Sequence, residues 1–364
     1  MSARGLSLVE LLVALAIGSL LVVAAVTLYA NGYRSYALNE AAARLQEQGR
    51  FVLSVLEPDI ELAGYYAFTN RAESMQFVRG GRLHLIVAGA AQLRQLPPPP
   101  ALPVPLAAIA ASAHVCGVNF AVDVTLPVQG SNDAFRLGPA AAAGCAPSGG
   151  AQPGADTLTI RRASIEPARA PAPGRVQIYA SRLRSHGPPL LFADGLAPGP
   201  LDGDHRIHDL VVRTYYVARS SVGQASRPAL RMKSLTTVSG TPAFRDTEVM
   251  PGVEDLQVQF GIDTGDYDDD GIIDAGADPD LDGIPEADGR VTRYVDPDFP
   301  DLARFQVVAV RIWVRMVAEQ PEPGFEDGRL YEYANVRYRP TGAAARYRHV
   351  LMSRTIALRN ARTL

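Results

Sequence analysis

The sequence predicts an α+β protein in which one long N-terminal helix packs against a mainly antiparallel β-sheet head. Three observations predict this class: an uncharged apolar run at residues 11–30, an amphipathic continuation of it, and alternating strand-like segments after Tyr65. As a helix, the apolar run would span about 30 Å, the thickness of the hydrocarbon core of a bilayer. We therefore expect one membrane-spanning helix that continues into a folded head.

The helical pattern extends beyond the apolar run, to about residue 64. Its apolar positions recur every three or four residues and therefore share one face: Leu45, Gly49, Val52, Leu53, Leu56, Ile60 and Ala63. Pro58 should kink or end this helix, and Gly64 should stop it. Residues 6–64 are thus predicted to form a stalk whose apolar stripe lies against the head.

Residues 65–364 are predicted to form a β-rich head. Val308, Val310, Ile312 and Val314 alternate with Arg311 and Arg315, as in a strand with one covered face. Candidate strands occupy 83–89, 156–162, 175–180, 189–194, 208–219, 229–238, 253–263, 305–318 and 348–360. Residues 96–105 form a stiff proline-rich loop. Aromatic residues of these strands are expected in the core and on sheet faces: Tyr215, Tyr216, Trp313, Tyr331 and Tyr333.

The chain has two cysteines, Cys116 and Cys145. In a cytosolic protein they would be unpaired thiols, but in an exported head a disulfide is the better interpretation. The bond would close a loop of about 30 residues and stabilise the fold by about 3–4 kcal/mol. His205 and His208 form an H-x-x-H pattern, which we interpret as surface histidines, because residues three apart in a strand face opposite ways. With no catalytic motif in the sequence, we expect no enzyme activity.

Residues 263–289 form an acidic segment with two copies of D-x-D-x-D-G-x-x-[DE] in tandem. The alternating carboxylates and two carbonyls suit Ca²⁺, and we expect one or two ions there. The candidate ligands are Asp266, Asp268, Asp270, Ile272, Asp274, Asp278, Asp280, Asp282, Ile284 and Glu286. The twelfth-position glutamate of an EF-hand is missing, and the tandem spacing resembles the calcium-binding repeats of thrombospondin type 3. The alternative is a solvated acidic loop that binds nothing.

Charge by itself identifies no partner, because the net charge of the chain is only −3. Setting aside the eleven carboxylates of the acidic segment leaves +8 for the remainder. A basic head could favour polyanions, but we predict no specific nucleic-acid binding.

The N-terminus has one unexplained feature, Glu10, inside an otherwise apolar segment that follows Arg4 and Gly5. A carboxylate at membrane depth costs about 2.5–3.5 kcal/mol. This segment resembles the class III signal of type IV pilins and pseudopilins. The resemblance implies that a prepilin peptidase removes residues 1–5, cleaving between Gly5 and Leu6, and that Leu6 is then N-methylated. It also implies that Glu10 pairs with a terminal amine. Leu6 departs from the more usual phenylalanine.

Three further segments, at 47–66, 253–264 and 348–362, together resemble PilW-type minor pilins. The resemblance implies an inner-membrane protein with its head in the periplasm, which then enters an extracellular pilus near the tip. Its partners would be other minor and major pilins and a tip adhesin, and its roles pilus assembly, adhesion and twitching motility. Two alternatives stay open: a large minor pseudopilin of a type II secretion system, and a membrane-anchored calcium-binding adhesin or enzyme that does not polymerise.

Overall fold

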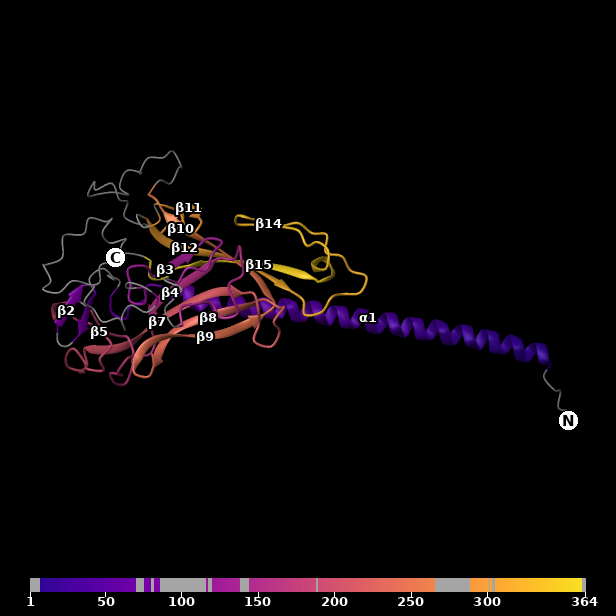
Figure 1. Cartoon of the computed structure of the whole chain (residues 1–364), viewed down its shortest axis with the longest axis horizontal. Coiled ribbons are helices and arrows are strands. Elements are labelled where there is room, and N and C mark those ends of the chain that lie inside the picture. Colours follow the sequence, from indigo (N-terminus) through magenta and orange to yellow (C-terminus); the bar gives the residue numbers. More distant parts are fainter. Residues whose placement is uncertain are drawn as a thin grey trace.

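The computed structural model describes residues 7–69, 75–79, 82–85, 116, 120–137, 144–187, 189–265, 289–300, 302 and 305–361. One helix, α1 (Leu8–Glu61), begins far from the head and ends inside it (Figure 1). Its 54 residues extend over about 81 Å. The helix continues through Pro58 to Glu61, and Gly64 follows in a left-handed turn with φ of +77°. The predicted long helix is therefore present, with its end close to both predicted stop signals.

The strands of the head form three sheets in the described part of the chain. The largest has the order β2-β1-β6-β5-β7-β4-β3, with β8 paired to β7 and β9 paired to β8. Its members are β1 (Gln76–Arg79), β2 (Arg82–Leu85), β3 (Val128–Ser131), β4 (Thr157–Ala163), β5 (Gln177–Ser181), β6 (Leu190–Phe192), β7 (His205–Ala218), β8 (Ala229–Val238) and β9 (Thr241–Pro251). Strands β1 and β6 run parallel, and the other pairs of this sheet are antiparallel.

The second sheet is antiparallel, with the order β11-β10-β12-β15. Its strands are β10 (Val253–Asp263), β11 (Arg293–Val295), β12 (Gln306–Val317) and β15 (His349–Ala357). A small hairpin of β13 (Tyr331–Tyr333) and β14 (Val336–Tyr338) forms the third. Short 3₁₀ turns lie at Arg184–His186 and Ala344–Arg346. An α+β fold with one long helix and mainly antiparallel sheets is thus confirmed.

The apolar stripe of the helix lies in the main core, as predicted. Its side chains pack with those of β10, β12 and β15, and with Leu158, Ile160 and Tyr215 of the large sheet. Gly49 allows the closest approach, because a Cβ at this position would meet the Met352 sulfur at 2.5 Å. A second apolar cluster, around Tyr66, Cys116 and Cys145, fills the other half of the head.

The structure contains strands that the sequence reading missed: β1, β3, β9, β11, β13 and β14. Strand β9 carries Pro242 near its start and Pro251 at its end, and proline is disfavoured in strands. It tolerates them because, among the strands that the structure describes, it pairs with β8 alone and therefore lies at an edge. The long strands before and after the acidic segment, β10 and β12, are antiparallel neighbours.

Candidate functional sites

The first site is the start of α1. The Ser7 hydroxyl accepts a hydrogen bond from the Glu10 backbone N–H at 3.2 Å, and the Glu10 carboxylate accepts one from the Ser7 N–H at 2.9 Å. This is a capping box, and its S-x-x-E signal was present in the sequence. Glu10 thus has a local role that sequence reasoning missed. Gly5 and Leu6 lie outside the described residues.

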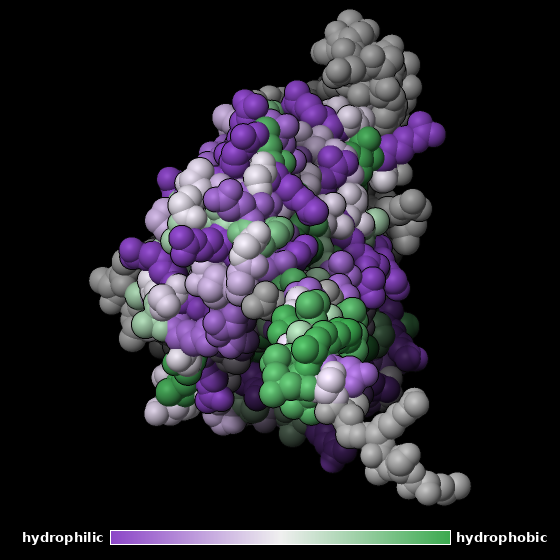
Figure 2. Space-filling view, turned by 90° about the vertical axis from the view of Figure 1, so that its right-hand side faces the viewer, coloured by the Kyte–Doolittle hydropathy of each residue, from purple (hydrophilic) through white to green (hydrophobic). Residues whose placement is uncertain are grey.

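The N-terminal half of α1 stands clear of the head (Figure 1). Large apolar side chains along it are exposed, from Leu8 at 75 % to Tyr36 at 68 %. By length and composition, α1 is a helix that could cross a membrane, and its most apolar window is not buried at all. Figure 2 looks at the molecule from this end and shows a contiguous hydrophobic patch against a largely hydrophilic head. So large an apolar surface requires a partner or a lipid environment.

The second site is the attachment of α1 to the head, centred on Asp59, which is 2 % exposed. Its carboxylate accepts hydrogen bonds from Arg162 of β4 at 2.9 and 3.1 Å and from Arg213 of β7 at 2.8 and 3.0 Å. The Tyr215 hydroxyl donates a further bond at 2.6 Å. We call these four residues the Asp59 clamp. It holds the last turn of the helix to two strands of the large sheet.

Electrostatics tighten the Asp59 clamp. Burial raises the pKa of the Tyr215 hydroxyl, and the Asp59 carboxylate raises it further, so the hydroxyl stays a donor. Burial by itself would lower the pKa of the Arg213 guanidinium, but the adjacent carboxylate outweighs burial, and that pKa is raised. Tyr215 and Arg213 are therefore both held in the protonation state that binds the Asp59 carboxylate.

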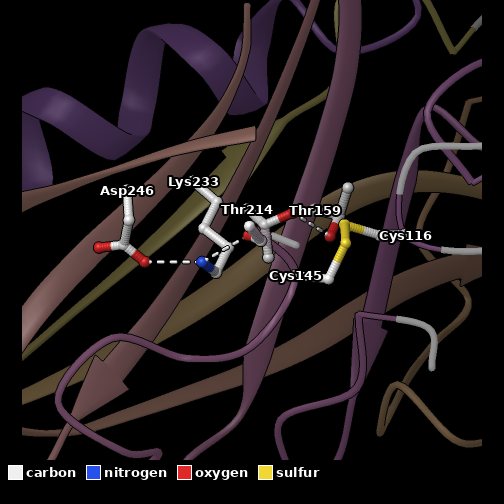
Figure 3. Close-up of a disulfide and its surroundings, with 7 residues drawn as sticks. Cys116, Cys145, Thr159, Thr214, Lys233 and Asp246 are labelled. Atoms are coloured by element: carbon white, nitrogen blue, oxygen red, sulfur yellow. Dashed lines mark hydrogen bonds and ion pairs between the residues drawn. A yellow bond between two sulfur atoms is a disulfide. The ribbon is translucent and has the colours of Figure 1, made fainter. Parts of the chain in front are cut away.

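A second paired carboxylate, the half-buried Asp246 of β9, lies near the disulfide (Figure 3). It pairs with Lys233 at 2.8 Å and with Arg231 at 2.6 Å, and the Tyr216 hydroxyl donates to it at 2.6 Å. Burial opposes its charge, but these donors outweigh burial and hold the pKa of Asp246 below its usual value. Lys233, 1 % exposed, also donates to the Gly144 carbonyl at 2.9 Å. The ion pair thereby fixes the backbone next to Cys145.

The predicted disulfide between Cys116 and Cys145 is present, with a Cα–Cα distance of 5.4 Å. Both residues are 1 % exposed and lie in the second apolar cluster, beside the hydrogen-bonded hydroxyls of Thr159 and Thr214 (Figure 3). The bond therefore joins two otherwise distant segments inside a packed core.

The ten predicted calcium ligands lie at 266–286, outside the described residues. Both ends of their segment are described. The Asp263 carboxylate, 1 % exposed, accepts hydrogen bonds from the Gly265 N–H at 3.1 Å and the Gly289 N–H at 3.0 Å. At the same place, the Thr264 hydroxyl donates a hydrogen bond to the Thr292 hydroxyl at 2.9 Å. Asp263, counted among the acidic groups of the segment, thus ties its two ends together at the β10–β11 hairpin.

The interpretation of His205 and His208 as surface histidines is wrong. Both lie within β7, 8 % and 3 % exposed. His205 pairs with Asp202 at 2.7 Å and stacks on Tyr179, whereas the His208 ring bonds to the Ser164 carbonyl at 2.7 Å. Strand β7 begins earlier than its apolar pattern indicated, so these side chains are covered. Within the described ranges, no cluster of three or more metal-ligating side chains occurs.

Comparison with known proteins finds family matches at both ends of the chain. Residues 214–360 match the family described as type IV pilus-assembly protein W, and residues 1–26 match the prokaryotic N-terminal methylation motif. No curated protein matches the chain. A type IV-like pilin from Thermus thermophilus is 13 % identical, with 60 % of this chain and 83 % of that chain covered and a TM-score of 0.25.

The two family matches coincide with features described above. The N-terminal motif covers the exposed start of α1, and the pilus-assembly match runs from β7 to the end of β15, across the sheet that packs on the helix. The motif and the apolar helix are consistent with membrane anchoring and pilus association. The chain is therefore similar to type IV pilus-assembly protein W over residues 214–360, and it begins with a segment that matches the N-terminal methylation motif.

Proposed function

We propose that this protein is a minor pilin that enters a type IV pilus at or near its tip, where it primes assembly and supports adhesion and twitching motility. One observation carries the proposal: an apolar helix whose large side chains are exposed from Leu8 to Tyr36 and which carries Glu10 in its first turn. The inner membrane would cover this surface before assembly, with the head in the periplasm. Helices of other minor and major pilins would cover it in the fibre.

The size of the head favours a position near the tip. Residues 65–364 make up most of the chain, and a head of this size needs free space around it. A subunit at the end of a fibre has fewer neighbours than one along its length. In that position a bulky head could carry a tip adhesin without disturbing the packing of the shaft.

The first prediction concerns processing of the chain by prepilin peptidase. We expect the mature chain to begin at Leu6, with residues 1–5 removed and the new terminus N-methylated. Intact-mass analysis of chain purified from sheared fibres measures both changes. Retention of Met1, or cleavage after Ala16 as by a secretory signal peptidase, would contradict the proposal.

Substitution of Glu10 makes the second prediction. We expect Glu10→Ala to insert in the membrane but to be at least tenfold depleted from fibres, because the carboxylate would pair with a terminal amine in low dielectric. Glu10→Gln separates this role from helix capping, since glutamine also completes a capping box. Immunoblots of membranes and sheared fibres measure the ratio.

The matched control for capping is Ser7→Ala, which removes the other half of the box and keeps the charge. We expect it to enter fibres normally. If Glu10→Gln also enters normally, charge pairing is not the function of Glu10.

We also propose that residues 266–286 bind one or two Ca²⁺ ions through the ten ligands named above. The hydrogen bonds at the two ends of this segment support the proposal, because Asp263 accepts from both Gly265 and Gly289 and so holds the ends together. Without a cation, the carboxylates inside the closed segment would repel one another. Metal binding would order the segment and fix β10 against β11.

The third prediction concerns the effect of calcium on thermal stability. The fragment 34–364 should melt at a higher temperature in calcium than in chelator, because a ligand that binds only the folded state stabilises it by about 2.7 kcal/mol at a hundredfold excess over Kd. Magnesium should substitute poorly, since it prefers smaller octahedral sites. Asp268→Ala with Asp280→Ala should abolish the shift, as measured by differential scanning calorimetry.

Asp204→Ala with Glu326→Ala removes the same charge from exposed positions elsewhere and should leave the calcium shift intact. Two results together would show that the segment is a solvated acidic loop. The melting temperature of the unmodified fragment would be the same with and without calcium, and calorimetry would detect no heat of binding at millimolar metal.

A further inference from the structure

Strand β15 lies at an edge of the second sheet. Among the strands that the structure describes it pairs with β12 alone, over nine residues and without a register shift. Other edge strands are short or interrupted: β2 and β3 have four residues, β11 has three, and β9 contains two prolines and a bulge. The exposed Arg354 within β15 is paired with Glu57 of α1 at 2.5 Å. A long, regular edge of this kind is a site at which another chain can add a strand.

The backbone groups on the outer side of β15 can be identified from a hydrogen bond at its end. The Leu358 N–H donates to the Val308 carbonyl of β12 at 2.9 Å. Because alternate residues of a strand point their backbone groups to opposite sides, even-numbered residues of β15 bond to β12 and odd-numbered residues face outwards. The outward residues in the middle of the strand are Leu351, Ser353, Thr355 and Ala357.

The same chain closes the outer side of β15 at both ends. The His349 N–H donates to the Asp327 carboxylate at 3.3 Å, and the His349 carbonyl accepts from the Tyr331 hydroxyl at 3.1 Å. At the other end, the Arg359 N–H donates to the Glu61 carbonyl at 3.0 Å. Between these ends, the outward backbone groups have no hydrogen-bond partner among the described residues, and three of the four residues are exposed. We call residues 351–357 the open edge, which is about 20 Å long.

The groups beside the open edge define what fits it. A row of outward N–H and C=O groups is matched by an extended polypeptide, which presents the same groups at the same spacing. Val350 and Met352 are half-buried at the margin of the main core, on the sheet face that packs on α1. An added strand with apolar residues on that face would cover them, whereas its other face would lie beside the hydroxyls of Ser353 and Thr355. The segment that fits is therefore extended and alternates apolar with polar residues.

The direction of α1 argues against a second copy of this chain in that position. Gly49 lies against Met352, and Glu61 bonds to Arg359, so the helix and β15 run side by side in the same direction. An antiparallel pair of open edges would thus reverse one of the two helices, and helices that enter one membrane from the same side cannot run in opposite directions. A parallel pair about a two-fold axis would place each N–H opposite the same N–H. The occupant is thus a different polypeptide.

We propose that the open edge of β15 binds an extended segment of a different polypeptide, which adds a strand to the four-stranded sheet. Backbone hydrogen bonds hold this segment, and its alternating side chains give selectivity. The inference goes beyond the proposed function, because it names a binding surface on the head and the chemistry of its ligand.

Three synthetic peptides test the open edge with the purified full chain in detergent. Each has a seven-residue core between terminal lysines that keep it soluble. The first core alternates valine and threonine, the second has the same residues in two blocks, and the third is the first with a methyl group on every amide nitrogen. We expect the first peptide to bind at least tenfold more tightly than the other two, as measured by fluorescence anisotropy. Equal affinities, or no binding of the first peptide at millimolar concentration, would overturn the proposal.

Proline substitution locates the binding site on the chain. Thr355→Pro removes an outward N–H and leaves the bonds to β12 intact, so it should weaken binding of the first peptide at least tenfold. Thr355→Val keeps the N–H and should bind as the unmodified chain does. Thermal melting checks that both variants are folded, and Ser353→Pro, which removes another outward N–H, replaces Thr355→Pro if that variant is not. Full binding by a folded proline variant would overturn the proposal.

A second copy as the occupant is tested with Ser353→Cys in membranes under oxidising conditions. We expect this variant to stay monomeric, and disulfide-linked dimers of the chain would overturn the proposal. Peptide binding to the purified chain does not depend on assembly. Absence of the unmodified chain from fibres would therefore contradict the proposed function alone, and absence of peptide binding would contradict the open edge alone.

Discussion

Asp59→Ala is expected to lower the free energy of unfolding of the fragment 34–364 by about 3–5 kcal/mol, the usual cost of removing one partner from a buried ion pair. The variant leaves Arg162 and Tyr215, both buried, without their acceptor and Arg213 without its counter-charge. Urea unfolding measures the loss. Hydrogen exchange should rise most in the last turn of α1, which the Asp59 clamp holds to β4 and β7.

Glu57→Ala is the matched control, two residues earlier on the same helix. Glu57 pairs with Arg354 at 2.5 Å, but the Arg354 side chain is 49 % exposed. Exposed pairs contribute at most about 1 kcal/mol, so this variant should be nearly neutral. If Asp59→Ala costs no more than Glu57→Ala, the clamp does not stabilise the attachment of the helix.

Replacing both cysteines, Cys116→Ser with Cys145→Ser, is expected to cost about 3–4 kcal/mol, because the bond closes a loop with a sequence separation of 29. Both side chains are buried, so the hydroxyls of the double variant also enter an apolar cluster. Calorimetry of the fragment 34–364 measures the loss as a lower melting temperature.

The same bond should resist reduction while the head is folded, since both cysteine residues are 1 % exposed. In the native fragment, dithiothreitol should therefore react only as fast as the head opens, whereas in urea reduction should be rapid. Rapid reduction without denaturant would show that the bond lies outside the stable core. A double variant that melts like the unmodified fragment would show that it contributes nothing to stability.

The sequence predicted those parts of the fold that depend on local periodicity. The stripe from Leu45 to Ile60 is buried throughout, because spacing along a helix determines which side chains share a face. Long alternating strands such as β10 and β12 were recognised for the same reason. Short strands were missed: β13 and β14 have three residues each, too few to show a period.

The polar clusters could not be predicted, because they depend on contacts between distant residues. Asp59 meets Arg162 103 positions later and Arg213 154 positions later. In the sequence it is one acidic residue among several on a helix. The pairing of Lys233 with Asp246 required β9 to be known, and the burial of His205 and His208 required the true start of β7. At Glu10, by contrast, the capping signal was present in the sequence and was overlooked.

The packing of α1 also sets an order of events in the folding of the chain. Ile60 and Ala63 share the main core with Leu358 and Ala361, and the Arg359 N–H donates to the Glu61 carbonyl at 3.0 Å. These partners lie almost 300 residues apart in the chain. Contacts of such high contact order form slowly, and until β15 has been synthesised the apolar stripe of the helix lacks one of the strands that cover it. Newly made chains should therefore be prone to aggregation and proteolysis until their last strand is in place, and a nonsense mutation before Leu358 should be as damaging as one near the middle of the chain.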